Sequence, residues 1–352
     1  MSCKIILNCL KCSLLSIFLL FLQSGFAQSK FTGLETAIEE RRKVLGNDLM
    51  VFVASSDSIV YQKAFGDINT RTQMVVGASS KLFTAALVLQ LADEGKISLD
   101  DKISKYIPIF ESYFKSYVTI RHCLSHMTGI EAESFKLTSF TSKRKYNSLE
   151  EEVNAFAKKE IHANTGEEFR YNNIGLNIAA RVVEIVTKKK FEQLMRQRIF
   201  APLGMRNTTF TTDDGSAPNP SGGAKSTAAD YIRFLQMLLN KGKFNGKQIL
   251  SESAIAELRK VQVAKDRMKF IPKAAEGFQY ALGSWVMEGP EGIGATAKTL
   301  TAPSLFGTWP AVDFSRGYAY ILFPKSFEGE QKAAVYLEMK SVFDQQFGFL
   351  SK

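Results

Sequence analysis

Apolar runs near both ends of the chain predict β-strands. Residues 48–54 and 58–65 are rich in apolar and β-branched residues and are joined by a Ser-Ser-Asp turn, which predicts a hairpin. Three similar runs, at 278–287, 305–314 and 317–324, lie near the other end. Strands at both ends with other elements between them indicate one sheet built from both termini.

The segment between these strands shows helical periodicity. We expect helices at 80–95, 118–130, 149–159, 174–187, 190–199 and 226–241, with outer amphipathic helices at 33–45 and 329–347. The predicted fold class is therefore α/β (α+β), an antiparallel sheet flanked by helices and carrying an inserted all-helical lobe. The sheet lobe would comprise residues 28–80 and 277–352, and the helical lobe residues 81–276. A ligand, either a small molecule or a peptide, is expected in the cleft between them.

Residues 1–27 have the pattern of a signal peptide. Lys4 and Lys11 form a basic region, an apolar run follows, and the small residues Gly25 and Ala27 suit a cleavage site. The apolar run is short for a membrane span, which needs about 20 residues. We therefore expect a periplasmic or secreted domain at 28–352 with no stable membrane span after cleavage, although an uncleaved anchor stays open.

Composition limits the chemistry further. The 352 residues carry a formal charge of +10, but the basic residues are scattered and no nucleic-acid motif is present. Cys123 is the one cysteine after the leader, which excludes an internal disulfide and a cysteine metal cluster there. His122 and His126 are four residues apart, but no acidic ligand is suitably spaced, so we expect neither metal nor cofactor. The oligomeric state is not indicated.

The segment Gly77-Ala78-Ser79-Ser80-Lys81 opens the helix predicted at 80–95. A serine three residues before a lysine would share one helix face with it, near the positive end of the helix dipole. That arrangement is typical of hydrolases with a Ser-x-x-Lys nucleophile. Here the position three before Lys81 is Ala78, whose methyl group cannot attack a carbonyl carbon.

Five blocks in order make the chain resemble serine β-lactamase-related and penicillin-binding-protein-like hydrolases of the class C type, which include esterases and D-aminopeptidases. The blocks are GASSKLFTAALVLQLADEGKISLDDKISKYIP, VTIRHCLSHMTGI, TGEEFRYNNIGLNIAARVVEIVT, IFAPLGMRNTTF and GGAKSTAADYIRFLQMLLNKGK. By this resemblance Lys81 would activate the nucleophile, Tyr171 would act as a base or proton relay, and Asn173 would bind the substrate. A desolvated lysine and a neighbouring tyrosine suit proton transfer, and an asparagine both donates and accepts.

The resemblance breaks down at a second place. The family's third motif, Lys/His-Thr/Ser-Gly on an edge strand, should lie shortly before Phe306, where this chain has Ala302-Pro303-Ser304. Ser304 is thus the substrate-binding position that remains. Lys298-Thr299 would imitate the motif only if the strand slid, and a slip displaces the facing of a strand.

Two functions stay open. The first is a degenerate family member of the cell envelope that binds a peptide, peptidoglycan or acyl ligand in the cleft without acylation. The alternative is an active hydrolase of an ester, amide or β-lactam, using Lys81 and Tyr171 with a water or a substitute nucleophile. Ser79 and Ser80 follow Ala78 directly, but at about 100° per residue they should point away from the Lys81 face.

Overall fold

The computed structural model describes residues 31–132, 144–325 and 331–348, so the predicted leader at 1–27 lies outside the described residues. One seven-stranded antiparallel sheet forms its centre, in the order β2-β1-β13-β12-β11-β10-β9. The strands are β1 (Leu49–Ala54), β2 (Ile59–Phe65), β9 (Gln279–Tyr280), β10 (Trp285–Glu288), β11 (Thr299–Thr301), β12 (Trp309–Asp313) and β13 (Tyr318–Pro324). Because β1 pairs with β13, the sheet joins the two ends of the chain, as the sequence predicts.

Both faces of the sheet are buried. Along β1, Leu49, Val51 and Val53 enter one apolar cluster, whereas Met50 and Phe52 enter the other. This period of two is the ordinary alternation of a strand, and it makes β1 apolar at every position. The central strands therefore hold two separate hydrophobic layers in place.

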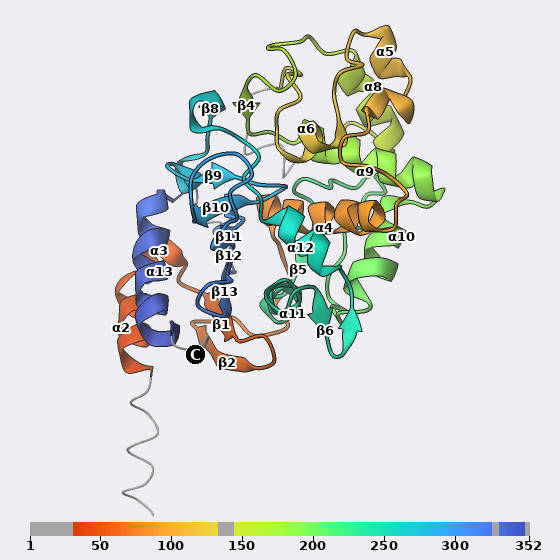
Figure 1. The fold of residues 1–352 in the computed structure, drawn as a ribbon. Coiled ribbons are helices and arrows are strands. Elements are labelled where there is room, and N and C mark those ends of the chain that lie inside the picture. Colours follow the sequence, from red (N-terminus) through yellow and green to blue (C-terminus); the bar gives the residue numbers. More distant parts are fainter. Residues whose placement is uncertain (1–30, 133–143, 326–330, 349–352) are drawn as a thin grey trace, which may run out of the picture.

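Helices cover each face (Figure 1). Helices α2 (Thr32–Glu40) and α13 (Ala333–Phe347) lie side by side on one face, although they come from opposite ends of the chain. Helix α11 (Ala228–Leu239) packs on the other face against β1, β12 and β13. The remaining helices are α3 (Arg42–Leu45), α4 (Ser80–Asp93), α5 (Ile109–Ser112), α6 (Ile120–Leu124), α8 (Leu149–Ala157), α9 (Ile174–Thr187), α10 (Phe191–Met195) and α12 (Glu252–Leu258).

Helix α4 differs from the surface helices in being buried on almost every side. Eleven of its fourteen residues are buried, Lys81 among them. A helix that is apolar all round belongs in the interior of a protein. Its position in the core explains how the sequence places a lysine where little water reaches. Among the described residues, no helix has the length and apolarity needed to cross a membrane.

The segment between the sheet halves is mainly helical. It is not all-helical, although an all-helical segment is what the sequence predicts. It also holds three two-stranded pairs, β3 (Met74–Val75) with β5 (Lys225–Ser226), β4 (Phe169–Arg170) with β8 (Met268–Phe270), and β6 (Lys243–Phe244) with β7 (Lys247–Gln248). Strands of two or three residues carry no alternating pattern, so the sequence could not reveal them. Helix α12 was also not predicted.

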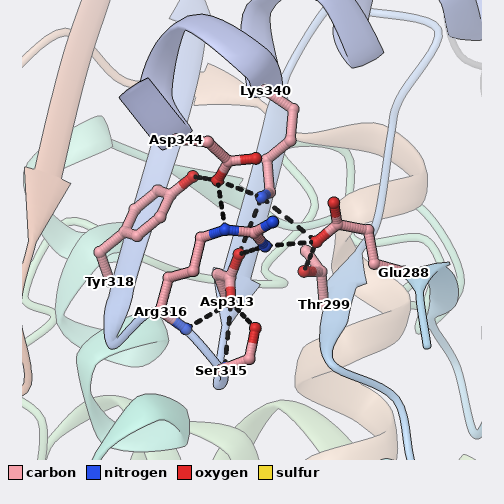
Figure 2. A network of polar contacts seen from close by, with 8 residues as sticks. All are labelled: Glu288, Thr299, Asp313, Ser315, Arg316, Tyr318, Lys340 and Asp344. Carbon is pink, nitrogen blue, oxygen red and sulfur yellow. Dashed lines mark hydrogen bonds and ion pairs between the residues drawn. The ribbon is translucent and has the colours of Figure 1, made fainter. Parts of the chain in front are cut away.

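A charge cluster around the buried pair Lys340 and Asp313 fastens α13 to the sheet (Figure 2). The Nζ atom of Lys340 lies 2.8 Å from Asp313, 2.6 Å from Asp344 and 3.3 Å from Glu288. Arg316 contacts Asp313 at 2.8 Å and Glu288 at 2.9 Å. Burial alone would raise the pKa of Asp313, but Lys340 outweighs it and the pKa is lowered. Since three carboxylates meet two cations here, the cluster is largely compensated and holds the helix in register.

Candidate active site

Ala78, at the position where the resemblance implies a nucleophile, is partly exposed to solvent. Gly77, Ala78 and Ser79 form a short 3₁₀ turn that leads into α4. Ala78 is half-buried, whereas Gly77, Ser79 and Ser80 around it are buried. The turn thus leaves Ala78 partly exposed at the position where the resemblance implies a serine.

Lys81 lies one turn further along the same helix, and its side chain is held from two directions. Its Nζ atom donates to Oδ1 of Asn173 at 3.0 Å and to the backbone oxygen of Ser221 at 2.9 Å. The residue is only 2% exposed. Burial lowers the pKa of Lys81 from 10.5 to about 7, because the charged amine loses its hydration. Lys81 is therefore divided between its neutral and charged forms near neutral pH.

Tyr171 covers Lys81 with its ring. The Nζ atom of Lys81 lies 4.7 Å from the centroid of the Tyr171 ring, within cation–π range. Burial raises the pKa of Tyr171. The phenol therefore stays protonated at neutral pH, so of the two predicted catalytic groups Lys81 is the better base. The structure brings Lys81, Tyr171 and Asn173 together, as the resemblance implies.

An aromatic wall, which the sequence did not predict as part of the site, stands behind Tyr171. The ring centroid of Tyr171 is 4.6 Å from that of His126 and 5.2 Å from that of Trp285. Nε2 of His126 is 2.9 Å from the hydroxyl of Tyr280. Burial, assisted by the nearby charge of Lys81, keeps the pKa of His126 well below its usual value. A neutral imidazole at this place adds no further positive charge beside Lys81.

The β9–β10 hairpin brings this wall against α4. Gly283 sits in the hairpin, and a Cβ there would meet the Cβ of Ala85 at 2.8 Å and the backbone oxygen of Lys81 at 3.0 Å. The backbone N–H of Gly283 donates to the carbonyl of Leu124 on α6. Only a glycine lets the strands approach the start of α4 this closely.

The two serines after Ala78 are both engaged elsewhere. The hydroxyl of Ser79 donates to the carbonyl of Ala302 at 2.6 Å, and that of Ser80 accepts from the N–H of Ala224 at 3.1 Å. Both residues are fully buried. Their hydroxyl groups therefore point into the core, as helix geometry predicts.

The third-motif segment lies beside the nucleophile position in the expected register. Ser304 packs so closely on Gly77 that a Cβ at residue 77 would come within 2.4 Å of its Oγ. Gly77 accordingly has a φ of +51°. The alternative register is not adopted, because Lys298 is exposed and Thr299 donates to Glu288 at the other end of β11.

Two details of this segment differ from the expectation. β11 pairs with β10 and β12, so it is an interior strand and not the edge strand we predicted. The N–H groups of Ala302 and Ser304 donate to Pro310 and Thr308, and Pro303 has no N–H. These three residues therefore offer no free backbone donor to a bound oxyanion.

A buried network of hydrogen bonds, which the sequence did not reveal, holds the groups that bind the Lys81 amine. The hydroxyl of Ser221 donates to the backbone oxygen of Asn173 and lies 2.8 Å from Oδ1 of Asn177. Asn177 in turn donates to Glu152 at 3.0 Å, and Glu152 pairs with Arg144. An asparagine one helical turn after Asn173, on an otherwise apolar face, is the signal that could have identified this network.

A half-open position at the start of a buried helix, backed by a lysine, a tyrosine and an asparagine, defines the class. It resembles the serine-hydrolase site of the β-lactamase and penicillin-binding-protein type, with Ala78 at the position where that resemblance implies a serine. The sequence matches the Beta-lactamase family over residues 34–339. The chain therefore belongs to that family.

Individual proteins are also similar to this chain in sequence. Penicillin-binding protein 4 of Amycolatopsis lactamdurans is 29% identical over 308 residues, which cover 76% of this chain and 77% of that protein. Protein flp of Staphylococcus aureus (strain MW2) is 27% identical over 171 residues, or 46% of this chain. The match spans only 34% of the length of that staphylococcal protein.

Solved structures confirm the fold. A candidate β-lactamase from Bacteroides dorei DSM 17855 superposes with a TM-score of 0.76 at 27% identity, covering 89% of this chain and 98% of that one. EstCE1, described as a hydrolase with promiscuous acyltransferase activity, gives a TM-score of 0.72 at 20% identity, with 89% and 98% covered. At that identity the likeness to EstCE1 concerns the fold alone.

Proposed function

We propose that this protein binds a peptide, peptidoglycan or other acyl ligand at the start of α4 without becoming acylated. The observation that carries the proposal is a partly exposed alanine, Ala78, at the position where the resemblance implies a nucleophile. Ser79 and Ser80, the nearest hydroxyls along the chain, are fully buried and bonded to the core. The covalent route therefore lacks an attacking atom, whereas the groups that would hold a substrate remain.

The charge of the site favours a ligand that carries a carboxylate. The N-terminal end of α4 has a partial positive charge, and Lys81, the second residue of the helix, adds its amine there. Below pH 7 this amine is mostly charged, since its pKa is about 7. Carboxylate-bearing peptides in the cell envelope match this site, and the predicted leader would deliver the protein there.

The decisive experiment compares the mature protein with an Ala78→Ser variant. Each is incubated with a fluorophosphonate and with a penicillin, and the intact mass is then measured. We expect no adduct on the native protein and a stoichiometric adduct on Ala78→Ser, because the new hydroxyl would share a helix face with Lys81. An Ala78→Ser/Lys81→Met double variant serves as the control and should not react.

The outcomes separate clearly. A stoichiometric adduct on the native protein would overturn the proposal, since it requires a nucleophile in place of Ala78. Failure of Ala78→Ser to react would instead show that the alanine at 78 is not the only feature that prevents acylation. Direct binding is measured by calorimetry with a D-Ala-D-Ala peptide and with its C-terminal amide, which lacks the carboxylate.

A second function is favoured by the lowered pKa of Lys81. A neutral amine near pH 7 can take a proton from a water molecule, which would allow slow hydrolysis without a covalent intermediate. Such activity would rise with pH around 7 and would be lost in Lys81→Met. If a chromogenic ester turns over at the same rate in native protein and in Lys81→Met, this second function is excluded.

A further inference from the structure

A polar cavity is lined by residues other than those of the Lys81 site. Its volume is about 580 Å³, and it is lined by the loop before β3, the turn after residue 200, the start of α11 and the β6–β7 hairpin. In Figure 1 the labels α11 and β6 mark its surroundings. Lys81, Tyr171 and Asn173 do not line it. The volume falls within the usual range of about 300–1,000 Å³ for ligand pockets.

Three arginines line this cavity, which we call the arginine pocket. Arg71 and Arg206 are exposed, and within the described residues their guanidinium groups have no hydrogen bond or ion pair. Arg233 donates one N–H to the carbonyl of Gly204 and keeps further donors. The three come from separate segments, so their convergence is a property of the fold.

One acid, Asp230, also lines the arginine pocket, but its charge is directed inward. Its Oδ2 accepts from the N–H of Asn207 at 2.7 Å and from the hydroxyl of Thr208 at 3.0 Å. The residue is 2% exposed, and its other oxygen lies 3.6 Å from Arg233. The lining therefore carries a net charge of about +2, with the positive groups on the accessible side.

We propose that the arginine pocket binds a phosphate monoester of sugar size. The guanidinium forks of Arg71 and Arg206, which have no partner among the described residues, match the paired oxygens of a phosphate. A phosphomonoester also carries about the −2 charge that balances the lining. The cavity is larger than a phosphate group requires. Thr70, Asn207 and Asn245 supply hydrogen-bonding groups for hydroxyls, and the ring of Phe244 supplies an apolar wall.

Calorimetry with glucose 6-phosphate tests the proposal, with glucose as the uncharged comparison. We expect saturable binding of glucose 6-phosphate alone, weakened by added salt. Arg71→Ala and Arg206→Ala should each weaken binding about tenfold or more, because each removes charged hydrogen bonds. Both side chains are exposed and contact no partner in the part of the chain that the structure describes, so the variants should fold normally, which circular dichroism checks.

Arg196→Ala is the matched control, since Arg196 is an exposed arginine outside the arginine pocket. It should bind as the native protein does. A parallel arm uses phosphatidylcholine vesicles with and without phosphatidic acid; binding to the acidic vesicles with the same dependence on Arg71 and Arg206 would assign the phosphate to a lipid headgroup. Absence of saturable binding in both arms, or equal loss in Arg196→Ala, would overturn the proposal.

Discussion

The lowered pKa of Lys81 has a measurable consequence for stability, and Lys81→Met isolates it. In the unfolded chain the amine titrates near its ordinary pKa of 10.5, and in the folded protein near about 7. Between these values the unfolded state holds a proton that the folded state has released. Stability therefore rises with pH across this window, because the unfolded state binds more protons.

The size of the effect follows from the same two values. Each pH unit inside the window contributes about 1.4 kcal/mol, so the whole interval from about 7 to 10.5 corresponds to about 5 kcal/mol. Between pH 7 and 9, a range that is practical to measure, the free energy of unfolding should change by about half of that amount. Methionine has nearly the shape of lysine but no charge, so the variant loses the titration and keeps most of the packing. Losing the hydrogen bonds to Asn173 and Ser221 shifts the free energy of unfolding by the same amount at every pH. It therefore leaves the slope of this free energy against pH unaffected.

The assay is urea unfolding of the native protein and Lys81→Met at several pH values between 7 and 9. The difference in unfolding free energy should increase by about 1.4 kcal/mol per pH unit in favour of the native protein. Lys298→Met removes an exposed lysine and controls for the change in net charge. A difference for Lys81 that stays flat over this range, like that of the control, would refute the argument that burial lowers its pKa.

The remaining predictions concern packing and charge. Gly77→Ala should destabilise the protein by about 1–3 kcal/mol more than Gly95→Ala in thermal or urea unfolding. Both glycines have a positive φ, but of the two only Gly77 is placed so that a Cβ would meet another group, Oγ of Ser304, at 2.4 Å. Equal losses of stability in the two variants would contradict this close contact. Lys340→Met should cost about 3–5 kcal/mol, because it leaves three carboxylates around one cation. The exposed Lys332→Met is its control and should change stability by less than about 0.5 kcal/mol.

Much of the site could be predicted from the sequence because its motifs are local. Lys81 follows Ala78 by three residues, and Tyr171 and Asn173 share one short block. The helical register places Lys81 on the expected face, and the contact with Asn173 brings the two blocks together. The resemblance therefore identified the residues that meet, while their roles in binding or catalysis stay predictions.

Other parts of the site could not be predicted, because their partners are distant in the chain. The carbonyl that fixes Lys81 belongs to Ser221, 140 residues away. His126 looked like an ordinary helix residue, yet its ring lies against Tyr171 and Tyr280. A backbone carbonyl or an aromatic neighbour leaves no pattern in local sequence, since any residue has the first and most cores contain the second.

The sequence by itself determined the sheet built from both ends, the apolar helix α4, and the spacing of three residues between Ala78 and Lys81. These follow from periodicity and spacing, which act within a few residues. Only the tertiary structure decided that Lys81 is buried deeply enough to titrate near pH 7, and that Arg71, Arg206 and Arg233 converge on one cavity. Desolvation and charge convergence depend on what other segments cover or approach, and the path of the chain in space sets both.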